Sequence, residues 1–103
     1  MEYEIRISES AERDIDEILQ YMTEKLASPQ AAADWVGELE KRYGELSKYP
    51  RMYGQPNNEA LRQIGYRRFM IKNYVLFYRV NDTLREVIIA RVFYCGRNYE
   101  KYL

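Results

Sequence analysis

The stretch of residues 66–94 constrains the fold of this chain more than any other, because it reads as three consecutive β-strands. Its middle segment, residues 74–78, is the unbroken run Tyr-Val-Leu-Phe-Tyr, which is typical of a strand covered on both faces. The last segment, residues 87–93, is rich in β-branched residues and nearly as apolar. We therefore expect these two segments to be central strands that pair as a hairpin. Three such strands need a cover, which the first half of the chain must supply.

The first half of the chain predicts one short strand followed by two helices. Residues 2–8 alternate between apolar and charged side chains, as in a half-buried strand. Apolar residues then recur at helical spacing over residues 9–26 and again over residues 29–48. Between them, Ser28 is a helix cap and Pro29 suits the first helical position. Because the connection is short, the two helices should form an antiparallel hairpin whose apolar face covers the sheet.

The order of these elements predicts an α+β fold. An N-terminal strand and a two-helix antiparallel hairpin precede a three- to four-stranded antiparallel sheet that packs on the hairpin. Residues 49–58 are rich in turn formers and predict an exposed loop, and residues 60–72 should form the first long strand. That strand or the N-terminal one should be an exposed sheet edge. With no internal repeat in 103 residues, we expect a single domain over 1–103.

The composition excludes several classes of chemistry. The chain has no histidine, so the usual imidazole base and the commonest zinc ligand are missing. Its one cysteine, Cys95, allows no intrachain disulfide, and no paired metal-ligand spacing occurs. We expect no metal and no cofactor. Since no stretch approaches membrane-spanning length, we also expect no membrane partner and a cytoplasmic location.

Charge is divided unevenly along a chain whose formal net charge is zero. Residues 1–59 carry seven Lys and Arg against 13 Asp and Glu, and residues 60–103 carry nine against three. The basic half could attract a polyanion, or its arginines could be ordinary solvated residues at strand edges. Charge alone leaves both readings open.

Several segments carry a family resemblance in their order and spacing. They are residues 11–18 with Tyr21, the helix end at 46–54, and the segments 66–68, 74–80, 89–94 and 97–99. With these segments the whole chain resembles the RelE/ParE superfamily of toxins from bacterial type II toxin–antitoxin modules, and is closer to the ParE-like branch. The resemblance implies a growth-inhibiting toxin that a cognate antitoxin neutralises, in a module of the kind that can also stabilise plasmids.

The superfamily implies two different targets. RelE-like members are ribosome-dependent endoribonucleases that cleave mRNA on the translating ribosome, whereas ParE-like members poison DNA gyrase without nuclease chemistry. RelE-like ribonucleases commonly carry an arginine where this chain has Val75, which cannot hold a phosphate. DNA gyrase is therefore the leading expected target, and mRNA is the alternative. A non-toxic protein-interaction module remains a third interpretation.

Candidate site residues follow from what each target requires. Cleaving RNA without histidine or metal needs arginine, lysine and tyrosine side chains that converge. If the chain is a ribonuclease, the catalytic candidates are Arg68, Tyr94, Arg97 and Tyr102. The candidates for target binding are Arg67, Arg68, Arg91, Arg97 and Tyr99.

Two of the polar or aromatic candidates also have a structural interpretation. Arg91 stands in an otherwise apolar strand, so it either pairs with an acidic helix residue or points into a functional groove. Trp35 lies on the apolar stripe of the second helix and is expected to be core packing.

Overall fold

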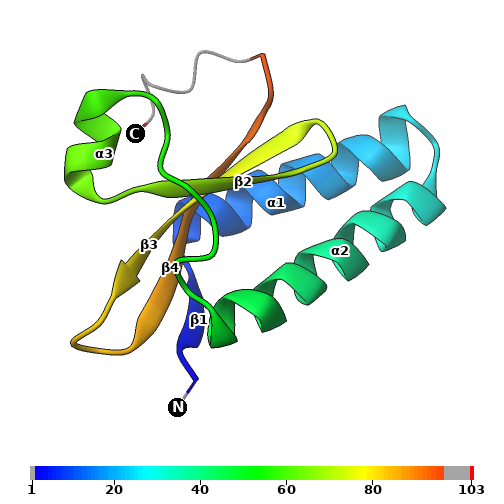
Figure 1. The fold of residues 1–103 in the computed structure, drawn as a ribbon. Helices are drawn as coiled ribbons and strands as arrows, with labels where there is room; N and C mark the ends of the chain where they lie inside the picture. Colours follow the sequence, from blue (N-terminus) through cyan, green and yellow to red (C-terminus); the bar gives the residue numbers. More distant parts are fainter. Residues whose placement is uncertain (1, 97–102) are drawn as a thin grey trace.

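The computed structural model describes residues 2–96 and 103 and contains one four-stranded sheet with two long helices packed against it (Figure 1). The strand order is β1-β4-β3-β2. The elements in chain order are β1 (Glu4–Ile7), α1 (Glu9–Gln20), a π-helical turn η1 (Tyr21–Lys25), α2 (Pro29–Lys48), α3 (Glu59–Ile64), β2 (Arg67–Ile71), β3 (Tyr74–Asn81) and β4 (Glu86–Tyr94). The predicted α+β architecture is confirmed. No helix in the described part of the chain is long and apolar enough to cross a membrane.

The two long helices begin where their capping residues predict. The Ser8 hydroxyl accepts a hydrogen bond from the Ala11 N–H at 3.0 Å, and the Ser28 hydroxyl accepts one from the Ala31 N–H at 3.1 Å. Helix α2 has the predicted bounds, with Pro29 in its first turn. The first helix continues from α1 into η1, where the Leu26 N–H donates to the Tyr21 carbonyl at 3.1 Å. Figure 1 shows the resulting antiparallel helical hairpin.

The strand predicted over residues 60–72 is wrong in its first part. Residues 59–64 form helix α3, because the Asn58 side chain caps it by accepting a hydrogen bond from the Leu61 N–H at 3.0 Å. Gly65, at φ 99°, ends the helix in the left-handed conformation that glycine adopts without a Cβ penalty. The strand starts only at Arg67, so the edge of the sheet is the shorter β2.

The strands that follow the helical hairpin are antiparallel as predicted, but the sheet is mixed because the N-terminal strand β1 adds a parallel edge. The pairs β2–β3 and β3–β4 are antiparallel, whereas β1 runs parallel to β4. The helical hairpin causes this difference. It returns the chain to the end of the sheet where β1 begins, and there the Tyr3 N–H donates to the Ser47 carbonyl at 2.9 Å. After two further turns, β4 therefore runs in the direction of β1.

Strand β3 is buried on both faces, as its apolar run predicts. One face carries Leu76 and Tyr78 into the main core under α1 and α2. The other carries Val75 and Phe77 into a second core with Leu61 of α3, Tyr66 and Phe93. Trp35 is 1% exposed in the main core, which confirms its packing role.

An ion pair joins helix α1 to strand β4 at the point where β1 has ended. The Asp14 carboxylate accepts hydrogen bonds from Arg91 Nε at 2.8 Å and Nη2 at 3.1 Å. It also accepts the Val92 backbone N–H at 2.9 Å. Because β1 ends at Ile7, opposite Ile89, Asp14 satisfies an edge N–H that β1 no longer reaches. Of the two interpretations of Arg91, the structure shows the pairing with an acidic helix residue.

We expect Asp14→Ala to lower the free energy of unfolding by about 2–4 kcal/mol, since it leaves a largely buried guanidinium and a backbone N–H unpaired. Urea denaturation followed by circular dichroism measures this loss. Asp16→Ala, an exposed carboxylate on the same helix, is the matched control and should change stability by no more than about 0.5 kcal/mol. Equal effects of the two variants would contradict the role assigned to Asp14.

A second ion pair holds the β3–β4 turn to the loop that follows α2. Arg51 Nη2 lies 2.6 Å from Asp82 Oδ2, and the Tyr3 hydroxyl donates to Asp82 Oδ1 at 2.6 Å. The hydrogen bonds from Arg51 and then Tyr3 lower the pKa of Asp82 to about 2. An unfolded chain has an aspartate pKa of about 4.

The low pKa of Asp82 predicts a pH-dependent contribution to stability. A carboxyl group whose pKa is depressed by folding stabilises the fold above the unfolded pKa and loses that effect as pH falls through the folded pKa. The stability difference between the wild type and Asp82→Asn should therefore shrink as pH falls from about 4 to about 2. Thermal unfolding at several pH values measures it. Arg51→Gln removes the main cause of the shift and should reproduce the behaviour of Asp82→Asn; a difference that stays constant with pH would contradict the prediction.

Candidate functional site

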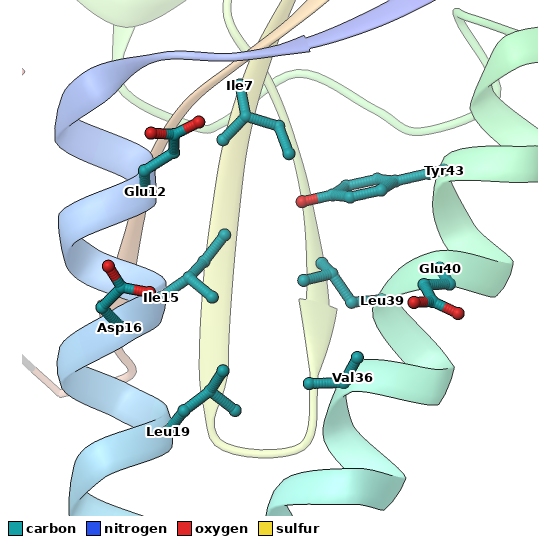
Figure 2. Close-up of a pocket in the computed structure, with 9 residues that line it drawn as sticks. All are labelled: Ile7, Glu12, Ile15, Asp16, Leu19, Val36, Leu39, Glu40 and Tyr43. Carbon is teal, nitrogen blue, oxygen red and sulfur yellow. The ribbon is translucent and has the colours of Figure 1, made fainter.

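A groove runs between helices α1 and α2, and its floor is apolar (Figure 2). Its volume is about 380 Å³. The apolar lining residues are Ile7, Ile15, Leu19, Val36 and Leu39. These belong to the stripes that the sequence assigned to packing on the sheet. The hairpin opens enough to leave part of them accessible, so the groove can accept apolar side chains of another chain.

Three carboxylates lie along the same groove. Glu12 and Asp16 come from α1 and Glu40 comes from α2. All three residues are exposed, and within the described chain none of them forms an ion pair. An occupant whose apolar residues are flanked by lysine or arginine would match this groove in both polarity and charge.

Tyr43 lies across the groove from α1 and points its hydroxyl toward that helix (Figure 2). The hydroxyl oxygen is buried and has no hydrogen-bond partner among the residues that the structure describes. Burial raises the pKa of Tyr43, so the phenol stays protonated and can donate a hydrogen bond. A buried hydroxyl without a partner costs free energy relative to one that is hydrogen-bonded.

Both edges of the sheet are partly occupied by the chain itself. At the β2 edge the Arg68 N–H donates to the Gly54 carbonyl at 3.1 Å, so the loop after α2 covers this end of the strand. On the β1 side, the carbonyl of Tyr3 accepts the Ser47 hydroxyl at 2.7 Å. The groove is therefore the more accessible surface for a partner, compared with these edges.

The predicted arginine sites have separate environments. Arg67 Nη1 donates to the Tyr53 carbonyl at 2.7 Å, which ties β2 to the preceding loop. Arg91 is bound to Asp14 as described above. Arg68 lies beside Cys95, where its charge partly offsets the burial that raises the pKa of the thiol. Of the remaining candidates, Arg97, Tyr99 and Tyr102 lie outside the described residues.

Arg68 and Tyr94 lie on opposite faces of the sheet. Arg68 stands opposite Phe77, whose ring belongs to the second core. Tyr94 stands opposite Tyr74, which packs with the main core under the helices. Directly opposed residues share a face, so the structure does not bring these two side chains together. The ribonuclease site expected from the sequence needs them to converge.

Which residues line the groove could not be predicted from the sequence, because every apolar position at helical spacing looks like core. Two signals were present: Tyr43 brings a polar hydroxyl onto the apolar stripe, and Glu12, Asp16 and Glu40 border that stripe.

Among the described residues, no group of three or more His, Cys, Asp or Glu side chains is placed to hold a metal ion.

Comparisons of the sequence and of the structure with known proteins both identify toxins of type II toxin–antitoxin systems. The family model for the ParE toxin of the type II toxin–antitoxin system parDE matches residues 5–99. Toxin ParE1 of Caulobacter vibrioides is 37% identical over 98 residues, which cover 95% of each chain.

Two solved structures have the same fold. The toxin–antitoxin complex RelBE2 from Mycobacterium tuberculosis contains a chain that is 26% identical, with a TM-score of 0.63, over 91% of this chain and 99% of that one. The chromosomal ParDE system from P. aeruginosa contains a chain with a TM-score of 0.70 and 19% identity, over 90% of this chain and 96% of that one. With the family model covering nearly its whole length, this chain belongs to the ParE toxin family of type II toxin–antitoxin systems.

Proposed function

We propose that this toxin arrests bacterial growth by acting on DNA gyrase in the cytoplasm, and that a cognate antitoxin neutralises it. The choice of DNA gyrase over mRNA rests on the environment of Val75. This side chain is 2% exposed and packs in the second core with Phe77 and Phe93. A RelE-like ribonuclease has an arginine at the matching position. A charged side chain could not enter this apolar cluster without a large desolvation cost.

The positions of the other candidates support the same target. RNA cleavage without histidine needs several cationic and phenolic side chains around one phosphate. In the described part of the chain, Arg68 and Tyr94 occupy opposite faces, and Arg91 is held by Asp14. Inhibition of a protein target does not require such a cluster of catalytic side chains, because surface contacts alone can inhibit it. A ribosome-dependent mRNA endoribonuclease is the alternative, and it would need Arg97 or Tyr102 to complete a site around Arg68.

The groove between α1 and α2 is the proposed binding surface for the antitoxin. Its apolar floor suits the apolar face of an amphipathic segment, and its carboxylates suit flanking basic residues. The Tyr43 side chain also lines the groove and enlarges the surface that such a segment can contact. An antitoxin bound here would contact both α1 and α2, and both helices contribute residues to the main core.

Inducing the toxin alone in a bacterial host should stop DNA synthesis before protein synthesis. The reason is that a gyrase poison blocks replication while ribosomes and mRNA are still intact. Pulse-labelling of DNA and protein over the first minutes measures the order. Purified toxin should likewise inhibit gyrase supercoiling of a relaxed plasmid.

The variant Arg68→Gln serves as the control for the alternative. A ribonuclease would lose toxicity on this change, would stop protein synthesis first and would leave cuts in translated mRNA. These results would show that the target is mRNA and would contradict the proposal that it is DNA gyrase. Growth without any arrest would instead identify a non-toxic interaction module.

We expect Val36→Glu to lower the affinity of the toxin for the antitoxin by at least about tenfold, because it places a charge on the apolar floor of the groove and removes apolar contact area. The measurement is the affinity of the purified toxin for its cognate antitoxin. Ala33→Glu, at an exposed position on α2 that does not line the groove, is the matched control and should bind normally. Unchanged affinity of the Val36→Glu toxin, with its helical content intact, would place the antitoxin elsewhere.

A further inference from the structure

A second pocket lies on the other side of α1, and three tyrosines and one carboxylate line it. This tyrosine pocket is lined by Glu17, Ile18, Tyr21, Tyr74 and Tyr94 and has a volume of about 360 Å³. Tyr21 and Tyr94 are 50% and 57% exposed, so another molecule can contact their rings. No residue of this pocket has a part in the groove between the helices.

The pocket is held in shape by packing beneath it. The rings of Tyr74 and Tyr94 meet edge to face, with centroids 5.7 Å apart and an interplanar angle of 79°. Tyr74 in turn rests on the buried Trp35, again at 5.7 Å. Burial raises the pKa of Tyr74, and the neighbouring phenols of Tyr21 and Tyr94 add to the rise, so the Tyr74 hydroxyl remains neutral near pH 7.

The third tyrosine reaches the pocket from an irregular turn. Tyr21 is the first residue of η1, where the helix widens to the five-residue spacing seen in the Leu26 to Tyr21 hydrogen bond. Such π-helical turns occur frequently at functional sites, because they turn side chains away from the regular helical positions.

The tyrosine pocket carries one negative charge, that of Glu17, and no positively charged residue in the described part of the chain forms an ion pair with it. Glu17 makes no ion pair there, and Lys25, which lines the adjoining pocket with it, does not bind it. Glu24 lies in that adjoining pocket too. A carboxylate beside several π faces attracts a cation by charge and by ring quadrupole together.

The chain places arginines over its aromatic rings elsewhere. Arg85 lies over the ring of Tyr3 at 4.9 Å, Arg79 over Tyr66 at 5.5 Å and Arg42 over Tyr53 at 5.8 Å. In the part of the molecule that the structure describes, the three tyrosines of the pocket carry no such cation. Their rings are therefore available to a cation from another molecule.

We propose that the tyrosine pocket is a recognition site for a basic side chain, an arginine by preference, presented by a protein partner of the toxin. A planar guanidinium can stack on a tyrosine ring while it donates to the Glu17 carboxylate, and it loses less hydration than an ammonium group. The proposal requires only a partner with an exposed arginine. It is independent of whether the toxin's target is gyrase.

A peptide titration of the full chain, made by cell-free synthesis with ¹³C-labelled tyrosine, tests the proposal. The probe is the capped tripeptide Gly-Arg-Gly, and its neutral counterpart carries citrulline in place of arginine. Saturable shifts of the Tyr21, Tyr74 and Tyr94 ring signals are expected with the arginine peptide, at an affinity about three- to tenfold above that of the citrulline peptide. A lysine peptide should fall between the two.

Two variants and one control localise the effect. Tyr94→Leu and Glu17→Gln should each lower the affinity for the arginine peptide by about threefold or more. Tyr49→Leu, an exposed tyrosine after α2 and outside the pocket, should leave it unchanged. Equal binding of both peptides, shifts confined to other tyrosines, or full affinity in the two pocket variants would each overturn the proposal. A toxin that binds the arginine peptide but does not inhibit gyrase would leave this site standing and remove the proposed target alone.

Discussion

The ion pair between Asp14 and Arg91 is the contact on which the arrangement of helix and sheet depends. Strand β1 is only four residues long, so within the described residues β4 beyond Ile89 has no strand on its β1 side and is paired there with β3 alone. Asp14 takes that place, accepting the Val92 N–H and two guanidinium hydrogen bonds at once. The ion pair itself is a weak source of stability, because desolvation offsets most of the attraction. Its effect is to fix where α1 lies against β4.

The position of α1 determines the shape of both proposed binding surfaces. One side of the helix places Ile15 and Leu19 in the groove that α2 closes, and the other side places Ile18 and Tyr21 beside Tyr74 and Tyr94. The two surfaces therefore share one wall. A partner that binds on either side contacts a helix whose place is already fixed by Asp14, so little ordering has to accompany binding.

Four arginines in the second half of the chain make contacts within the fold. Arg91 and Arg67 hold elements together, through Asp14 and the Tyr53 carbonyl respectively. Arg79 and Arg85 cover tyrosine rings near the β3–β4 turn. The excess of positive charge in the second half of the sequence thus includes several structural contacts, and it is a poor guide to a site for nucleic acid.

The sequence by itself determined the elements and the family of this protein. Caps at Ser8 and Ser28, the apolar stripes and the run at residues 74–78 each depend on nearest neighbours, so the two long helices and the central hairpin were predictable. Helix α3 was missed because it has only six residues, which is too short for apolar periodicity to show, and the Asn58 cap alone did not identify it.

Only the tertiary structure decided the rest. It made β1 parallel to β4, paired Arg91 with Asp14 and placed Arg68 and Tyr94 on opposite faces. The physical reason is that these relations join residues far apart in the chain. Periodicity reports which side chains share a face of one element, whereas packing decides which faces meet and which stay open to a partner.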